Sequence, residues 1–300
     1  MCGIVGYVGD RDCADVLVDA LSKLEYRGYD SAGIAVVEKG VIKVEKCKGR
    51  LANLVDKMAV DVKPQGHCGI GHTRWATHGE PSDINSHPHG NKRVSIVHNG
   101  IIENYKQIKD FLIEEGYSFV SETDTETVAK LLDYYYVDDP VDTIIKVLSE
   151  IKGSYALGIM FRDYPDTVFA VRKECPLIVG VGENENFLAS DVPAIIKYTR
   201  DYYLLEANEI AVVKKDSVQI YDMHKEPVHK EINTADWDVD AAEKGGYEHF
   251  MLKEIHEQPA AVRATVSPRI INGMPDLSQD GVDMQKLKDY RQIFIVDCGT

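Results

Sequence analysis

The run Met1-Cys2-Gly3-Ile4-Val5-Gly6 opens the chain with a cysteine directly after the initiator methionine, followed by an apolar segment. A small second residue generally permits removal of Met1, and the thiol and a free α-amino group would then belong to the same residue. The amine, with an ordinary pKa of about 7.7 to 8.0, can accept the proton of a thiol with a pKa of about 8.5 near neutral pH. The run therefore predicts a catalytic N-terminal cysteine. The alternative is a structural cysteine that begins a buried strand.

Composition limits the class of protein. Three hundred residues with 44% hydrophobic content can bury one large core, or one domain and part of a second. The net charge of -15 and the lack of a basic run argue against a nucleic-acid partner. Six cysteines without a C-x-x-C pair favour thiols in a reducing compartment over disulfides or zinc. No window approaches the roughly 20 apolar residues of a membrane span, so we expect a cytoplasmic protein.

Apolar periodicity gives a first outline of the fold. Spacing of three and four residues predicts amphipathic helices over residues 12–25, 104–115, 125–136 and 141–151. Alternating segments predict two hairpins, formed by residues 33–37 with 41–46 and by residues 209–214 with 217–222. Further strands are expected over residues 155–161, 167–172 and 177–181. Grouped helices with hairpins on either side predict a layered α+β architecture rather than a strict βαβ alternation.

The pattern changes towards the end of the chain. Acidic residues and the pair Gly245-Gly246 predict a linker over residues 233–246. A helix is expected over residues 247–266, and the apolar run 293–300 is expected to open a further domain that is cut short. We therefore predict one domain over residues 1–240, followed over residues 241–300 by a linker and the start of a second domain.

The string His72-Thr73-Arg74-Trp75-Ala76-Thr77-His78-Gly79 follows an apolar strand over residues 68–71 and is expected to form a loop at the strand end. The planar guanidinium of Arg74 is suited to hold a small carboxylate with two hydrogen bonds. The alternative for Arg74 is a surface ion pair.

The string His98-Asn99-Gly100 follows a second apolar strand, over residues 94–97. The Asn99 side-chain amide and the N–H of Gly100, which a ligand can approach closely, would together form a two-donor oxyanion hole. The alternative is a hairpin turn, which is the usual role of an Asn-Gly pair.

Asp124 comes directly before the predicted helix 125–136, and Thr123 and Glu126 have the spacing of a capping box. A carboxylate at this place stabilises a helix N-terminus whatever the function. If the Asp124 side chain faces a pocket instead, it could bind a cationic amine.

The triplet His87-Pro88-His89, with His78 nearby in sequence, raises the question of a metal site. No third and fourth ligands accompany it at a convincing spacing, so we expect no metal.

Taken together, these segments resemble the glutaminase half of the glutamine:fructose-6-phosphate aminotransferase (glucosamine-6-phosphate synthase) family. The resemblance rests on Cys2 to Gly6, Leu24 to Gly33, His72 to Pro81, Val97 to Asn104, Ser121 to Glu126 and Lys253 to Pro259. The strings Arg-Gly-Tyr-Asp-Ser-Ala-Gly and Thr-Arg-Trp-Ala-Thr-His-Gly carry most of its specificity.

The resemblance implies a fold, a chemistry and a set of roles. The fold would be the four-layer α/β/β/α sandwich of N-terminal-nucleophile hydrolases, with two antiparallel sheets. Cys2 would attack the amide of L-glutamine and form a thioester, without any cofactor. The roles implied for the other residues are oxyanion stabilisation by Asn99 and Gly100, binding of the α-carboxylate by Arg74 and of the α-ammonium by Asp124, completion of the pocket by Thr77 and His78, and a mobile gate formed by Trp75.

The family's sugar-phosphate site lies in an isomerase half beyond residue 300, so fructose 6-phosphate would be a partner only through that half, as would association into a homodimer. Two other hypotheses stay open at this point. The chain could serve another pathway, as in amidophosphoribosyltransferase, or it could be a non-catalytic glutamine-sensing module.

Overall fold

The computed structural model describes residues 2–76, 78–235 and 246–294. The chain folds as two compact units, Met1–Glu243 and Lys244–Thr300. The predicted domain boundary at residues 240 and 241 and most of the predicted linker lie outside the described residues.

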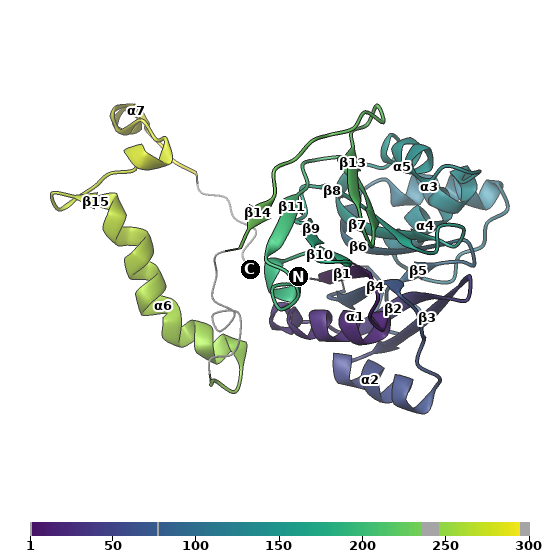
Figure 1. Cartoon of the computed structure of the whole chain (residues 1–300). Helices are drawn as coiled ribbons and strands as arrows, with labels where there is room; N and C mark the ends of the chain where they lie inside the picture. Colours follow the sequence, from purple (N-terminus) through teal and green to yellow (C-terminus); the bar gives the residue numbers. More distant parts are fainter. Residues whose placement is uncertain (1, 77, 236–245, 295–300) are drawn as a thin grey trace. The chain divides into compact units, whose positions relative to one another are not determined.

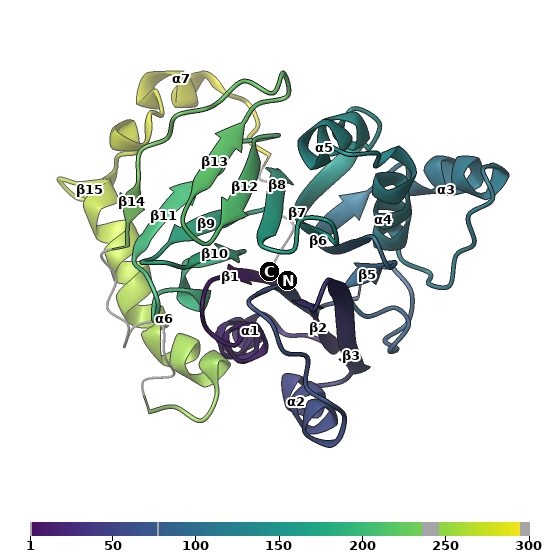
Figure 2. The same cartoon turned by 45° about the vertical axis from the view of Figure 1, so that its right-hand side comes forward.

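Two antiparallel sheets form the centre of the first unit (Figures 1 and 2). The larger sheet has eight strands in the order β14 (Asn233–Thr234), β11 (Asp201–Leu204), β9 (Ile178–Val181), β10 (Asn186–Ala189), β1 (Gly3–Val8), β4 (Cys68–Arg74), β2 (Ser31–Glu38) and β3 (Val41–Lys48). The smaller sheet has six strands in the order β13 (Val218–Tyr221), β12 (Ile210–Lys214), β8 (Thr167–Lys173), β7 (Gly153–Phe161), β6 (Val94–Ile102) and β5 (His89–Gly90).

Helices cover the outer face of each sheet (Figure 1). Against the larger sheet pack α1 (Cys13–Ser22) and α2 (Leu51–Val60). Against the smaller sheet pack α3 (Tyr105–Glu114), α4 (Asp124–Tyr135) and α5 (Pro140–Leu148). A third apolar cluster fills the space between the two sheets. The result is the four-layer α/β/β/α sandwich, which confirms the predicted α+β class.

Strand β1 shows how the sequence produces these layers. All six residues of β1 are buried. Val5 and Tyr7 contribute to the cluster under α1, whereas Ile4 and Val8 contribute to the cluster between the sheets. Successive side chains of a strand point to opposite faces, so a strand buried on both faces must be apolar at nearly every position. The opening of the chain therefore specifies a central strand of a sandwich.

The predicted hairpins and helices of the first unit are confirmed, with bounds that differ by at most three residues. The helix α2 was not predicted, because its buried stripe is narrow. The stripe consists of Leu51, Leu54 and Met58. Two predicted strand ends were placed too early. Strand β4 continues to Arg74, so residues 72–74 belong to the strand and not to the expected loop. Strand β6 continues to Ile102.

The second unit consists of α6 (Phe250–Val266), a small hairpin of β15 (Ile270–Ile271) with β16 (Met274–Pro275), and α7 (Met284–Asp289). The predicted helix over residues 247–266 thus begins at Phe250. The final apolar run was predicted from residue 293, and residues 295–300 lie outside the described part of the chain. Within that part, no helix combines the length and the apolar character needed to cross a bilayer.

Candidate active site

Cys2 directly precedes β1, which lies between β10 and β4 in the larger sheet. The Cys2 Sγ accepts a hydrogen bond from the backbone N–H of Trp75 at 3.0 Å and lies 3.4 Å from the Trp75 carbonyl oxygen. Burial raises the pKa of the Cys2 thiol, while the Trp75 N–H and the charge of Arg74 act in the opposite direction. Unlike the fully buried Cys13 and Cys68, Cys2 is only half-buried.

Asn99 brings the smaller sheet to Cys2. Its side-chain Nδ2 donates a hydrogen bond to the backbone carbonyl oxygen of Cys2 at 3.1 Å. Asn99 lies inside β6 and pairs with Ala156 of β7, so the hairpin-turn interpretation of the Asn-Gly pair is wrong. Two residues 97 positions apart in the sequence are thus in direct contact.

Gly100 is required by the backbone at this point of β6. Its φ angle is +123°, which side chains other than hydrogen rarely permit. A Cβ atom at this position would lie 2.1 Å from the carbonyl oxygen of Ser154. Only glycine therefore fits beside Asn99.

Arg74 is the last residue of β4, and only 3% of it is exposed, so the surface ion-pair interpretation is wrong. Its Nη2 donates hydrogen bonds to the carbonyl oxygens of His78 and, at 2.9 Å, Gly79. Its Nη1 is 3.8 Å from the Asp30 carboxylate and has no hydrogen-bond partner among the described residues. A buried guanidinium donor without a partner is costly unless a ligand completes it.

Asp124 is the first residue of α4, but its side chain does not cap the helix. Its Oδ2 accepts a hydrogen bond from the backbone N–H of Ile102 at 2.8 Å and lies 4.0 Å from Nδ1 of His98. The capping role belongs to Thr123, whose hydroxyl accepts a hydrogen bond from the Glu126 N–H at 3.3 Å. Asp124 is 4% exposed, so its carboxyl group is buried at the end of β6.

The remaining predicted site residues follow Arg74 along the chain. Trp75 is 54% exposed, and its ring lies over Gly28, where an added Cβ would meet ring carbon Cζ3 at 2.5 Å. The His78 ring contacts Tyr105 edge-on, with 5.4 Å between the ring centres. Thr77 lies outside the described residues.

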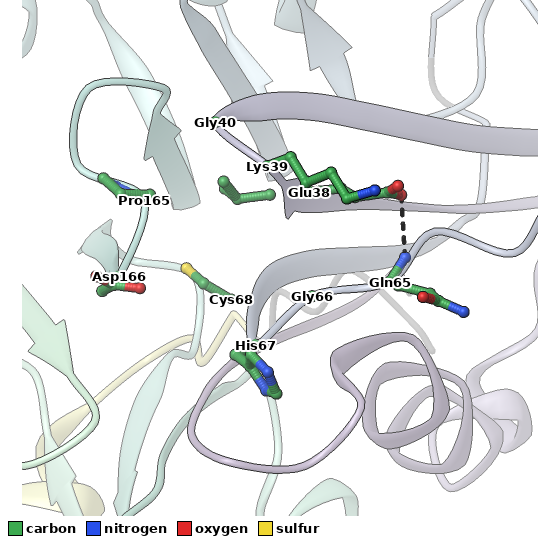
Figure 3. Close-up of a pocket in the computed structure, with 10 residues that line it drawn as sticks. Glu38, Lys39, Gly40, Gln65, Gly66, His67, Cys68, Pro165 and Asp166 are labelled. Atoms are coloured by element: carbon green, nitrogen blue, oxygen red, sulfur yellow. Dashed lines mark hydrogen bonds between the residues drawn. The ribbon is translucent and has the colours of Figure 1, made fainter.

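A pocket of about 350 Å³ lies elsewhere in the first unit. Figure 3 shows its lining by the β2–β3 turn, the segment before β4 and the β7–β8 turn, with the Cys68 sulfur near Asp166. Cys68 is the first residue of β4 and Arg74 the last, so the two ends are about 20 Å apart at ~3.3 Å per residue. We place the candidate site at the Arg74 end because the convergent polar groups lie there, although the pocket lies at the other.

Four buried histidines surround the candidate site, and the sequence analysis singled out two of them only as a doubtful metal motif. The Thr125 hydroxyl lies 2.9 Å from His87 Nε2 and 2.9 Å from His98 Nδ1, and the rings of His72 and His87 are 4.2 Å apart. Burial lowers the pKa of all four, His89 included. No group of three or more metal-binding side chains is positioned for an ion among the described residues.

His72 is the functional candidate that the sequence reasoning missed. The alternation of inward-facing Cys68 and Ile70 in β4 continues to His72, and this signal could have placed its side chain between the sheets. Treating residue 72 as the start of a loop concealed it.

The glutamine amidotransferase domain family matches residues 72–197. Over its whole length the chain is 56% identical to the glutamine–fructose-6-phosphate aminotransferase (isomerizing) of Caldanaerobacter subterraneus subsp. tengcongensis, and it covers 50% of that relative. The corresponding enzymes of Clostridium tetani and Methanosarcina mazei are 53% and 45% identical, with the same coverage. The chain belongs to the glutamine amidotransferase family. It spans about half the length of the curated relatives it matches.

Solved structures agree with this assignment at the level of the fold. The glutamine phosphoribosylpyrophosphate amidotransferase of B. subtilis has a TM-score of 0.65 at 24% identity, with 74% of this chain and 49% of that chain covered. A glutamine aminotransferase class-II domain protein from silicibacter pomeroyi has a TM-score of 0.54 at 13% identity, with 74% and 99% covered. At these identities the likeness establishes the shared sandwich alone. The identity to the glutamine–fructose-6-phosphate aminotransferases is much higher. The amidotransferase domain of this chain is therefore of the type found in those relatives.

Proposed function

We propose that this chain hydrolyses the side-chain amide of L-glutamine to glutamate and ammonia, with Cys2 as the nucleophile. The observation that carries the proposal is the contact between Cys2 and the Asn99 side-chain amide, with Nδ2 3.1 Å from the Cys2 carbonyl oxygen. That amide donor lies next to the attacking residue, as an oxyanion hole requires. The match to the glutamine amidotransferase family supports the same chemistry.

The reaction begins after removal of Met1, when the α-amine of Cys2 takes the Sγ proton. The sulfur then forms a bond to the amide carbon, and Asn99 Nδ2–H and Gly100 N–H stabilise the oxyanion. The amine returns the proton to the leaving nitrogen, the C–N bond breaks, and ammonia departs. Water then attacks the thioester, again with the amine as base, and glutamate leaves.

Substrate binding follows from the charges around this centre. Arg74 Nη1, buried and without a described hydrogen-bond partner, is suited to the α-carboxylate of glutamine. The buried Asp124 carboxylate is suited to the α-ammonium. Thr77 and His78, which follow β4 in the chain, would complete the glutamine-binding site, and Trp75 would act as its gate.

The wider role rests on the relatives' names. We propose that residues 1–240 are the amidotransferase domain and that residues 241–300 form a linker and the start of a sugar-isomerase domain. In a protein of the relatives' full length, the ammonia would pass to fructose 6-phosphate and yield glucosamine 6-phosphate. Such a protein would work in the cytoplasm without a cofactor and associate as a homodimer through the isomerase half.

One experiment separates this proposal from its alternatives. Purified chain is examined by mass spectrometry for loss of Met1, and glutamine hydrolysis is followed with and without prior labelling by a glutamine-like diazoketone. We expect a chain without Met1, active until one label is attached to Cys2. A retained Met1 would falsify the self-base mechanism. Glutamine binding without hydrolysis would favour the sensing module, and transfer of ammonia to a phosphoribosyl acceptor would favour the other pathway.

A further inference from the structure

His72 spans the space between the two sheets at the candidate site. It belongs to β4 of the larger sheet and is 1% exposed. Its Nε2 lies 3.0 Å from the backbone carbonyl oxygen of His98 and 3.0 Å from Oδ1 of Asn99, both on β6 of the smaller sheet. A single ring nitrogen of His72 thus contacts the backbone of His98 and the side chain of the next residue, Asn99.

The His98 contact determines which nitrogen of His72 carries the hydrogen. A backbone carbonyl oxygen can only accept, so Nε2 must be the donor. Nδ1 of His72 has no hydrogen-bond partner among the described residues, and burial lowers the pKa of the ring to about 3. His72 is therefore a neutral imidazole with its proton on Nε2.

This tautomer in turn determines the orientation of the Asn99 amide. The Asn99 atom next to the Nε2–H must be an acceptor, which is Oδ1, and the amino group must then point the other way. On that side Nδ2 donates to the Cys2 carbonyl oxygen at 3.1 Å. Rotating the amide by half a turn would set an N–H donor against another donor and leave the Cys2 carbonyl oxygen facing Oδ1.

We propose that His72 is a positioning residue that fixes the Asn99 side-chain amide with its N–H group directed at the oxyanion formed during attack by Cys2. This inference rests on the proposed glutaminase function. His72 does not touch the reacting atoms. It acts by removing the second orientation of Asn99, so that the donor is in place before the charge develops and needs no reorganisation when it does.

The packing of the ring supports this role. The His72 ring packs against the His87 ring, with 4.2 Å between the ring centres and 33° between the ring planes, and His87 Nε2 lies 2.9 Å from the Thr125 hydroxyl at the start of α4. The imidazole therefore cannot swing away from Asn99 without disturbing a buried hydrogen-bonded neighbour.

The first test is kinetic and uses the full chain. His72→Phe keeps a ring but removes the donor, whereas His72→Gln places an amide N–H near the position of Nε2. We expect His72→Phe to lower kcat for glutamine about 100-fold, with KM changed less than about three-fold, and His72→Gln to recover most of the loss. A rise in KM with unchanged kcat would overturn the inference.

A double-mutant cycle then asks whether His72 acts through Asn99. In an Asn99→Ala background, His72→Phe should cost no further activity, since no amide is left to orient. An equal loss in both backgrounds would overturn the proposal and indicate a general structural role. If His72→Phe does not fold, His72→Gln and His72→Asn, which differ in where their amide N–H lies, provide the comparison.

A third measurement needs no activity. Nitrogen NMR of the histidine side chains, assigned with the His72→Gln variant, should show His72 neutral and protonated on Nε2 between pH 5 and pH 8. Protonation on Nδ1, or an imidazolium, would overturn the inference. If NMR showed the expected tautomer but the chain did not hydrolyse glutamine, the proposed glutaminase function would fail, while the orientation of the Asn99 amide would be supported.

Discussion

The two ends of β4 differ in what they offer chemically. At the Arg74 end, polar side chains from both sheets converge, and His72 and Arg74 are almost fully buried. At the Cys68 end a pocket of about 350 Å³ lies among turns, and burial raises the pKa of the thiol there. The difference between the two ends is one of preorganised polar groups against empty volume, and the proposed chemistry depends on the former. The first two predictions below change matched residues at the two ends, and the others concern the Arg74 end.

The largest difference is expected between two cysteines. Cys2→Ala should lower glutamine hydrolysis by more than about 1,000-fold and leave glutamine binding in place, since Arg74 and Asp124 remain. Cys68→Ala should change kcat less than about two-fold and lower the free energy of unfolding by about 1 to 3 kcal/mol, because it leaves a cavity. Steady-state kinetics, calorimetric binding and urea unfolding test this pair. A comparable loss of kcat in Cys68→Ala would contradict the comparison.

The next difference is expected between two buried asparagines. Asn99→Ala should lower kcat by about 100- to 1,000-fold with little change in KM, because it removes an oxyanion donor. Asn186 lies at the Cys68 end, where its Nδ2 donates to the Lys214 carbonyl oxygen at 2.6 Å. Asn186→Ala should cost about 1 to 3 kcal/mol of stability and leave kcat unchanged. Equal kcat in the two variants would remove Asn99 from the site.

A smaller and more selective effect is expected at Asp124. Asp124→Asn keeps an oxygen for the Ile102 N–H but removes the charge, so KM for glutamine should rise about 10- to 100-fold. Competitive inhibition by an analogue that lacks the α-amino group should weaken by less than about three-fold. If the variant lost affinity for both compounds alike, Asp124 would not be the ammonium ligand.

The smallest effect is a pH dependence of stability confined to the Arg74 end. Burial lowers the pKa of His72 to about 3 and that of its three histidine neighbours in the same direction. Below about pH 6.5 the unfolded chain binds protons that the folded chain does not. The free energy of unfolding should therefore decrease as the pH is lowered below about 6.5, by about 1 kcal/mol per pH unit for each histidine that stays neutral in the folded protein.

Urea unfolding at pH 7 and pH 5.5 measures this slope. In His72→Gln, unfolding should take up about one proton fewer, so the free energy of unfolding should depend less steeply on pH. Cys68→Ala should keep the pH dependence of the parent chain. A stability independent of pH in this range would mean that these histidines take up protons in the folded protein as readily as in the unfolded chain, which would contradict the lowered pKa values.

Local pattern was sufficient for most of the fold. The helical spacing of α4 and α5 and the alternation in the β2–β3 hairpin predicted these elements within one to three residues. Apart from the unpredicted helix α2, the main errors fell at Arg74 and Ile102, where polar residues and glycine continue a strand. Such residues resemble a loop in sequence and are buried only because neighbouring strands pair with them.

For the candidate site, the sequence nominated residues but could not choose between their alternatives. From local sequence alone, a surface ion pair was the favoured interpretation of Arg74 and a hairpin turn that of Asn99. Burial of the first and the strand pairing of the second reject those interpretations. His72 was not nominated, because its role depends on a contact between sheets that no local pattern records.

The amino-acid sequence by itself determined the sandwich, through strands such as β1 that are apolar on both faces, and it nominated Cys2 as the nucleophile of the proposed reaction. Only the tertiary structure decided which polar side chains meet that cysteine. Residues such as Asn99 and His72 come together through the packing of one sheet on the other, and the direction of a hydrogen bond between them is a property of that packing.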